Sequence, residues 1–178
     1  MGRPRWLNEE EKRAWNAFRS AHTLLYQRLD QQLKQDADLS HLQYEILARL
    51  SGAPDRELRM TELACAVQNS KSGLTYQIGQ LEQAGLVRRR NCMSDVRAVY
   101  ACLTDEGMAM LERTAPGHVA LVRELFIDVL SPDQLTALAD GLDEVNRRMR
   151  ESPDPQTANP ASGNAREPSD VGGEKTCQ

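Results

Sequence analysis

Side chains that could hydrogen-bond to nucleic acid are concentrated between residues 71 and 84. Leu74, Ile78 and Leu81 recur there at i, i+4 and i+7, which predicts one narrow apolar stripe on a helix. Hydroxyl, amide and phenol groups fill most other positions, as a helix in the major groove needs in order to contact base edges and phosphates. An ordinary amphipathic surface helix is the alternative, although such helices usually carry Glu and Lys. The candidate DNA contacts are Ser70, Lys71, Ser72, Thr75, Tyr76, Gln77 and Gln80.

The residues before this helix predict a shorter helix and a tight turn that would position it. Leu63, Ala64 and Val67 share one face of residues 60–67, and residues 68–70 interrupt the pattern. Ser70 is the predicted N-cap of the polar helix, where short side chains bring the positive helix end close to a phosphate. Two helices joined in this way predict a helix-turn-helix.

A basic hairpin is predicted directly after the polar helix. Residues 86–90 and 98–103 are short and rich in β-formers, and residues 91–97 separate them. Four arginines against the single Asp95 give this segment a charge of +3 in a chain whose net charge is −4, which is an electrostatic footprint for DNA. A solvated surface hairpin is the alternative. The candidate contacts are Arg88, Arg90 and Arg97, with Arg97 in the minor groove and Asp95 holding it through a bidentate pair.

Wide apolar faces are predicted on long helices at both ends of the chain. One helix runs from Glu9 to about Lys34, and residues 119–130 carry a stripe too apolar for solvent. Such faces around a small helix-turn-helix are most simply buried against a second copy of the chain, with packing inside one chain as the alternative. The predicted N-caps of the remaining helices are Ser40, Thr104 and Ser131.

These elements predict a mainly α fold with a small β-hairpin wing, that is, a winged helix-turn-helix with long terminal dimerisation helices. The tail from Ser152 has no Leu, Ile, Phe, Tyr or Trp, so it cannot bury enough surface to offset its ordering entropy. The expected segments are an N-terminal dimerisation helix (1–36), a winged helix-turn-helix DNA-binding domain (37–104), C-terminal dimerisation helices (105–150) and a disordered tail (151–178).

Charge and hydropathy limit the possible partners and location. The tail carries −3 of the net charge of −4, which leaves residues 1–150 near neutral with basic local patches, as in a protein that scans DNA for specific sites. No apolar run approaches the roughly 18 residues of a membrane span, and the amino end has no apolar signal core. We therefore expect a cytoplasmic protein with no membrane partner.

Catalytic and metal-binding motifs are missing from the sequence. His22, His41 and His118 stand apart, and none lies in a zinc or triad motif. We therefore expect no enzyme activity, no cofactor and no metal.

The cysteines have no C-x-x-C spacing. Cys65 and Cys102 fall at predicted core positions and are expected to be inert. Cys92 lies among the arginines of the hairpin, which favour the thiolate. A redox role for Cys92 stays open beside an incidental one.

Several short motifs occur together between about residues 10 and 150. They are Leu39–Leu47, Glu62-Leu63-Ala64, Thr75 six residues before Leu81-Glu82, Gly85-Leu86-Val87, Asp95-x-Arg97 and Leu103–Gly107. In this combination the sequence resembles the MarR family of bacterial transcriptional regulators, although Arg59, Lys71 and Tyr76 depart from the residues common at their positions. The resemblance implies an obligate dimer of winged helix-turn-helix subunits that binds a palindromic operator, usually as a repressor released by a small molecule or by oxidation.

One face of the first helix mixes aromatic rings with a guanidinium and an imidazole. Trp15, Arg19, His22 and Tyr26 recur at spacings of 4, 3 and 4 and therefore share this face. The resemblance places effectors in a crevice between the first helix, the following helix and the wing domain. With Tyr44 from the following helix, these residues are the candidate site for a small aromatic acid. The alternative is that the two aromatic residues only pack the dimer while Arg19 and His22 are solvated.

The sequence thus predicts a sequence-specific DNA-binding regulator, a repressor that binds a palindromic operator as a homodimer and is released by a small aromatic or phenolic effector. Two alternatives stay open, namely a thiol-based redox regulator acting through Cys92 and a winged-helix module for protein assembly. The arginine hairpin beside a carboxylate-poor helix favours DNA, because an assembly module would not need that pairing.

Overall fold

The fold is given by a computed structural model, which describes residues 4–91 and 98–151. Long helices and three short strands confirm the predicted mainly α fold with a small β-hairpin wing. In chain order the elements are α1 (Glu9–Ala37), α2 (His41–Ser51), the 3-10 turn η1 (Pro54–Arg56), β1 (Glu57–Arg59), α3 (Met60–Ala66), α4 (Lys71–Gln83), β2 (Val87–Asn91), β3 (Val99–Leu103), α5 (Asp105–Val122), the π-helix η2 (Arg123–Ile127) and α6 (Pro132–Glu151).

The chain divides into two compact units. The first ends at Ser131 and holds α1 to η2 with the whole sheet, and the second begins at Pro132 with α6. Because α6 ends at Glu151, the predicted tail lies, apart from that residue, outside the described residues. The predicted segment boundaries stay predictions. Among the residues that the structure describes, no helix is long and apolar enough to cross a membrane.

Side-chain caps determine where four helices of the first unit begin. In each case a side-chain oxygen accepts a hydrogen bond from a backbone N–H that has no partner inside the helix. The predicted caps of α2, α4 and α5 are confirmed, and α1 has a cap, Asn8, that was not predicted. These bonds run to Asn8 from Glu11 (2.8 Å), to Ser40 from Gln43 (3.2 Å), to Ser70 from Gly73 (3.1 Å) and to Thr104 from Gly107 (3.0 Å).

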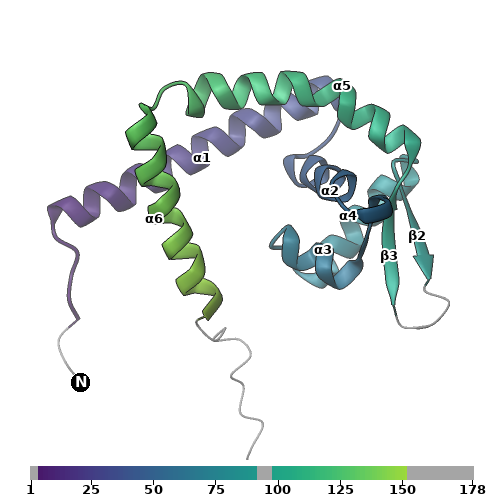
Figure 1. Ribbon diagram of the computed structural model, residues 1–178, viewed down its shortest axis with the longest axis horizontal. Coiled ribbons are helices and arrows are strands. Elements are labelled where there is room, and N and C mark those ends of the chain that lie inside the picture. The colour runs from purple at the N-terminus through teal and green to yellow at the C-terminus, as the bar shows by residue number, and fades with distance from the viewer. Residues whose placement is uncertain (1–3, 92–97, 152–178) are drawn as a thin grey trace, which may run out of the picture. The chain divides into compact units, whose positions relative to one another are not determined.

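The core of the first unit lies where α2, α3 and α4 meet the sheet, as Figure 1 shows. The predicted apolar stripes of α3 and α4 are buried in it. Cys102 is buried as predicted, but Cys65 is exposed, so its predicted core position is wrong. Leu63 and Ala64 occupy the core side of α3, and a helix turns by about 100° per residue, which carries Cys65 away from the core.

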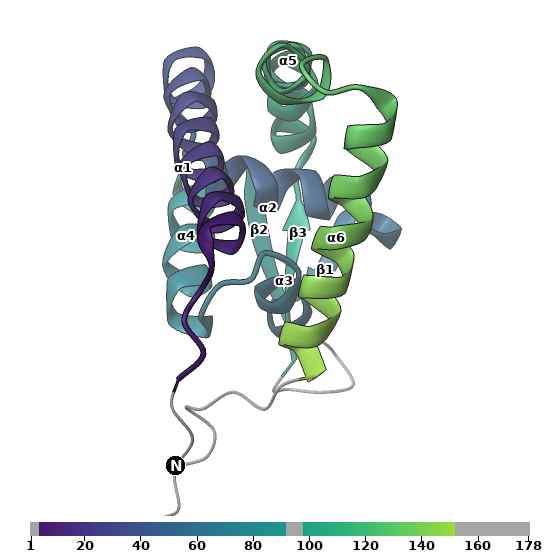
Figure 2. The ribbon, with the colours of Figure 1, turned by 90° about the vertical axis from the view of Figure 1, so that its left-hand side faces the viewer.

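The three strands form an antiparallel sheet in the order β1-β3-β2, which Figure 2 shows side by side. The sequence predicted the hairpin of β2 and β3, here called the wing hairpin (described residues 87–91 and 98–103), but missed β1. The pairing sets Arg90 opposite Tyr100, and Tyr100 opposite Arg59 of β1. Since side chains alternate between the faces of a strand, Arg88 and Arg90 lie on one face of β2 and Arg89 on the other.

Helix α5 packs against α1 and α2 and thereby joins the long helices to the helix-turn-helix. Several large apolar side chains on this part of the chain are only partly covered by the residues that the structure describes. Leu24 is 60% exposed and Val119 is 53% exposed. The others on α1 are Trp15, Phe18 and Tyr26.

Candidate nucleic-acid interface

Helix α4 presents a polar face to solvent because three apolar side chains anchor its opposite face. Leu74, Ile78 and Leu81 are buried, with at most 1% of their surface exposed. Tyr76 is 65% exposed and is the largest side chain on the outer face. The remaining exposed candidates of the sequence analysis on this helix are Lys71, Ser72, Thr75 and Gln80, while Gln77 is half-buried.

The first turn of α4 is ordered by its own side chains. The Ser70 hydroxyl accepts the Gly73 N–H at 3.1 Å and lies 3.3 Å from the Ser72 hydroxyl. A β-carbon at residue 73 would overlap Oδ1 of Asn69, so that side chain would have to move aside for a larger residue. This packing leaves hydroxyl groups around the positive end of the helix, where a phosphate would be favoured.

The charges along α4 are few. Lys71 and Glu82 are its only charged residues. Glu82 pairs with Arg89 of the wing hairpin at 3.2 Å, which offsets its negative charge. The exposed face of α4 therefore carries no carboxylate without a partner, as a surface that approaches a phosphate backbone requires.

Arg90, predicted as a DNA contact, is held by partners on the other two strands of the sheet. Its guanidinium forms an ion pair with Glu57 of β1, through Nε at 3.1 Å and through Nη2, and lies 4.8 Å from the centroid of the Tyr100 ring. The hydrogen bond from Arg90 lowers the pKa of Glu57, and a further one from Cys102 Sγ adds to this effect. Burial raises the pKa of the Cys102 thiol.

The partner of Arg90 lies on β1, a strand that the local sequence pattern does not predict. Arg88 shares the same face and is exposed. Asp95, Arg97 and the possible redox residue Cys92 lie outside the described residues, so their roles stay predictions.

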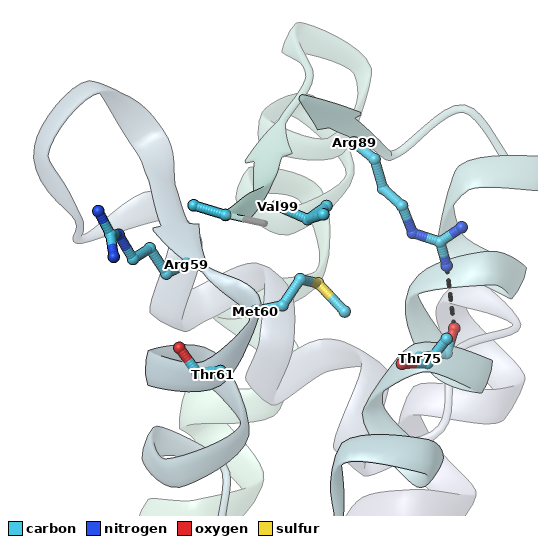
Figure 3. A pocket seen from close by; sticks show the side chains of 7 residues that line it. Arg59, Met60, Thr61, Thr75, Arg89 and Val99 are labelled. Carbon is cyan, nitrogen blue, oxygen red and sulfur yellow. Dashed lines mark hydrogen bonds between the residues drawn. The ribbon is translucent and has the colours of Figure 1, made fainter. Parts of the chain in front are cut away.

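Arg89 is not among the predicted contacts, yet its side chain bonds to α4. Its Nη2 donates to the Thr75 carbonyl oxygen at 3.0 Å, a bond that Figure 3 shows as a dashed line. Beside it lies a pocket of about 410 Å³ between α3, α4 and the wing hairpin. The alternation of side chains along a strand, which puts Arg89 on the opposite face from Arg88 and Arg90, is the sequence signal that distinguishes Arg89 from them. The pocket is lined by Arg59, Met60, Thr61, Thr75, Arg89, Ala98 and Val99.

The candidate effector residues of α1 do share one face, as their spacing predicted. Trp15, Phe18, His22 and Tyr26 follow one another with ring centroids 6.1 to 6.3 Å apart. The Arg19 guanidinium lies 5.8 Å from the centroid of the Trp15 ring. The structure therefore groups Trp15 with Arg19 on the exposed part of α1, while Tyr26 lies close to α2.

At the other end of this row, two histidines that stand apart in the sequence come together. The Tyr26 ring contacts His41 at 4.8 Å, His41 lies 5.8 Å from His118 of α5, and His118 lies 4.4 Å from Tyr44. The buried Nδ1 atoms of both histidines have no hydrogen-bond partner among the described residues. Burial lowers the pKa of both imidazoles, and His41 lowers that of His118 further.

The rings of Tyr26, His41 and His118 connect α1, α2 and α5, and the candidate residue Tyr44 packs against His118. Nearby acids face His41 from two helices. Asp30 of α1 accepts the His41 backbone N–H at 2.8 Å, and Asp30 and Glu45 of α2 both act to raise the pKa of His41. The desolvation of the imidazole lowers the pKa of His41 by more than these two acids raise it.

Comparisons with known proteins agree on one family. The model of the MarR family matches residues 39–99. The regulator PecS of Dickeya dadantii is 38% identical over 96 residues, which cover 53% of this chain and 55% of that protein. The repressor YetL of Bacillus subtilis is 37% identical over 84 residues, 47% of this chain and 50% of that protein. The matches thus span about half the length of these curated relatives.

A solved structure matches over a longer stretch. Sco3205 of Streptomyces coelicolor, a MarR family transcriptional regulator solved in complex with DNA, is 43% identical with a TM-score of 0.82. The match covers 84% of this chain and 94% of that one.

Proposed function

Since the chain belongs to the MarR family of transcriptional regulators, we propose that it binds a palindromic DNA operator as a homodimer and represses the genes that the operator controls. Members of this family are DNA-binding transcription regulators and not enzymes. YetL, a relative of this chain, is named as a repressor, which supports the direction of the proposed regulation. A regulator of this kind acts where the DNA is, which for a bacterial family is the cytoplasm.

The exposed face of α4 is the observation that carries this proposal. It offers hydroxyl, amide and phenol groups, and the single carboxylate on the helix, Glu82, is paired with Arg89. We assign α4 as the recognition helix, with Tyr76 at the centre of its exposed face. The wing hairpin beside it adds Arg88, and the predicted contacts of Asp95 and Arg97 remain part of the proposal.

Dimerisation is supported by the uncovered apolar side chains of α1 and α5. Leu24 and Val119 would leave water if a second copy covered them. In a symmetric dimer the two recognition helices would lie one DNA turn apart, about 34 Å, so half-site centres would be about 10 bp apart.

A small aromatic acid is the proposed effector. The face of α1 with Trp15, Arg19, His22 and Tyr26, together with Tyr44 of α2, supplies rings for stacking and a guanidinium for a carboxylate. A redox switch at Cys92 is the second candidate. These two classes differ in what releases DNA, an aromatic acid or peroxide.

Selection from a pool of randomised duplexes tests the proposed function. We expect enrichment of a palindrome, salt-dependent binding of it by the full-length chain, and sedimentation at about twice the mass of one chain. No enrichment over random duplex would overturn the proposal and leave the protein-assembly module. Adding aromatic carboxylates or peroxide to the bound complex then identifies the switch.

A further inference from the structure

The side chain of Arg89 connects the wing hairpin to the recognition helix. Its Nη2 donates to the Thr75 carbonyl oxygen at 3.0 Å, and its Nη1 lies 3.2 Å from Glu82 Oε2. The other carboxylate oxygen of Glu82 accepts the Arg89 backbone N–H at 3.1 Å. One arginine of β2 is thus bonded to two residues that lie seven positions apart on α4.

Three positions of the recognition helix accommodate this contact. Gly79 lies beside the guanidinium, and a β-carbon there would be at an ordinary contact distance of 3.7 Å from Arg89 Nη2. A carbonyl oxygen has two lone pairs, so Thr75 can accept from Arg89 in addition to its helix partner. Glu82 lies near the C-terminal end of α4, where a carboxylate is unfavourable beside the helix dipole, and pairing with Arg89 compensates for this.

We propose that Arg89 is a positioning residue, which through Thr75 and Glu82 holds the recognition helix at a fixed angle to the wing hairpin. The proposal rests on the function proposed above. Sequence-specific binding needs α4 and the wing hairpin to meet the DNA at the same time, and preorganisation lowers the entropy lost on binding. Non-specific binding needs only charge near the phosphates and gains little from a fixed angle.

Arg89 could instead contact a phosphate directly, and Glu82 distinguishes the two roles. Removing a negative charge close to DNA tightens binding if electrostatics alone decide the outcome. If Glu82 serves to hold Arg89, the same change weakens binding to the selected palindrome. The two roles therefore predict opposite signs for the substitution Glu82→Gln.

The experiment measures affinity for the selected palindrome and for random duplex, each at several salt concentrations, with full-length variants. We expect Glu82→Gln and Arg89→Met each to weaken palindrome binding by ~3- to 10-fold, as for loss of a charge-assisted contact. The double variant should bind the palindrome with the same affinity as the weaker-binding single variant, because both changes break the same contact. Glu82→Gln should leave random-duplex binding unchanged or slightly tighter, because that binding responds to charge near the phosphates and not to a fixed angle.

Two control variants complete the experiment. Glu112→Gln removes an exposed carboxylate from α5 and should not weaken palindrome binding. Arg88→Ala removes an exposed arginine and should weaken both duplexes together while reducing the salt slope by about 0.9. Circular dichroism confirms that each variant is folded, and Glu82→Gln remains informative if Arg89→Met does not fold.

Two results would overturn the positioning role while the proposed function stands. One is tighter palindrome binding by Glu82→Gln, and the other is additive losses in the double variant. If the parent itself does not discriminate the palindrome from random duplex, the proposed function fails, and the positioning role that serves it fails with it.

Discussion

The α-carbon of Gly107, in the first turn of α5, lies against the carbonyl oxygen of Leu86, so close that a β-carbon would overlap it. The same oxygen accepts the Thr104 N–H at 3.1 Å, and the Thr104 hydroxyl donates to Gly85 at 2.7 Å. The start of α5 is thereby joined to the turn that leads from α4 into the wing hairpin.

Gly107→Ala should therefore destabilise the protein by roughly 1–3 kcal/mol or more, the cost of overpacking against backbone that cannot move aside. Urea denaturation measures the free energy of unfolding. The matched control is Gly141→Ala on α6, where a β-carbon would meet no atom of the described residues within 4 Å. It should be neutral or stabilise by up to about 1 kcal/mol, because alanine favours a helix over glycine. Equal stabilities of the two variants would show that Gly107 tolerates a side chain.

Stability should fall on acidification through the pair His41 and His118. Their pKa values are lowered by burial, so the unfolded chain binds protons first, near the ordinary pKa of about 6.5. Their contribution is present above that pH and is lost as the pH falls through the lower folded pKa values. The melting temperature should fall from pH 7 toward pH 5.

The substitution His118→Phe tests this prediction, because it keeps a ring against Tyr44 and removes the titrating group. Its melting temperature should depend less on pH in this range than that of the parent. His22→Ala, at an exposed residue of α1, is the control and should keep the parental pH dependence. A His118→Phe profile parallel to that of the parent would contradict the assignment.

Tyr76→Ala should weaken operator binding by about 1–3 kcal/mol, the range of one good directed base contact. Since Tyr76 is 65% exposed, the melting temperature should not change measurably. Leu74→Ala is the contrasting variant, because Leu74 is buried, and it should cost about 2–5 kcal/mol of stability. Gel shifts and thermal melts separate the two effects. Parental operator affinity of Tyr76→Ala would place this tyrosine outside the contact surface.

Leu24→Glu should shift the protein from dimer toward monomer. Leu24 is 60% exposed in one chain, so the charge costs the single fold little but would be desolvated in a dimer interface. Sedimentation velocity over a range of concentrations measures the shift, and circular dichroism checks the fold. Glu10→Gln, at an exposed residue near the start of α1, is the control and should leave the dimer intact. An unchanged dimer in Leu24→Glu would place the interface elsewhere.

The sequence by itself determined the features that depend on neighbouring residues. The caps Ser40, Ser70 and Thr104, the apolar stripe of α4 and the wing hairpin all follow from local spacing, because each needs contacts over a few residues only. The resemblance of several such motifs to one family could also be recognised from the sequence. These local features were enough to predict the fold class and the polar face of the recognition helix.

Only the tertiary structure decided which residues meet across the chain. Strand alternation puts Arg89 and Arg90 on opposite faces of β2. Because β2 packs between α4 and β3, Arg89 pairs with Glu82 of α4, and Arg90 pairs with Glu57 of β1. The pair of His41 and His118 exists because α5 returns to α2. Such partners depend on long-range packing, which local periodicity does not encode, since one pattern fits several arrangements of the same elements.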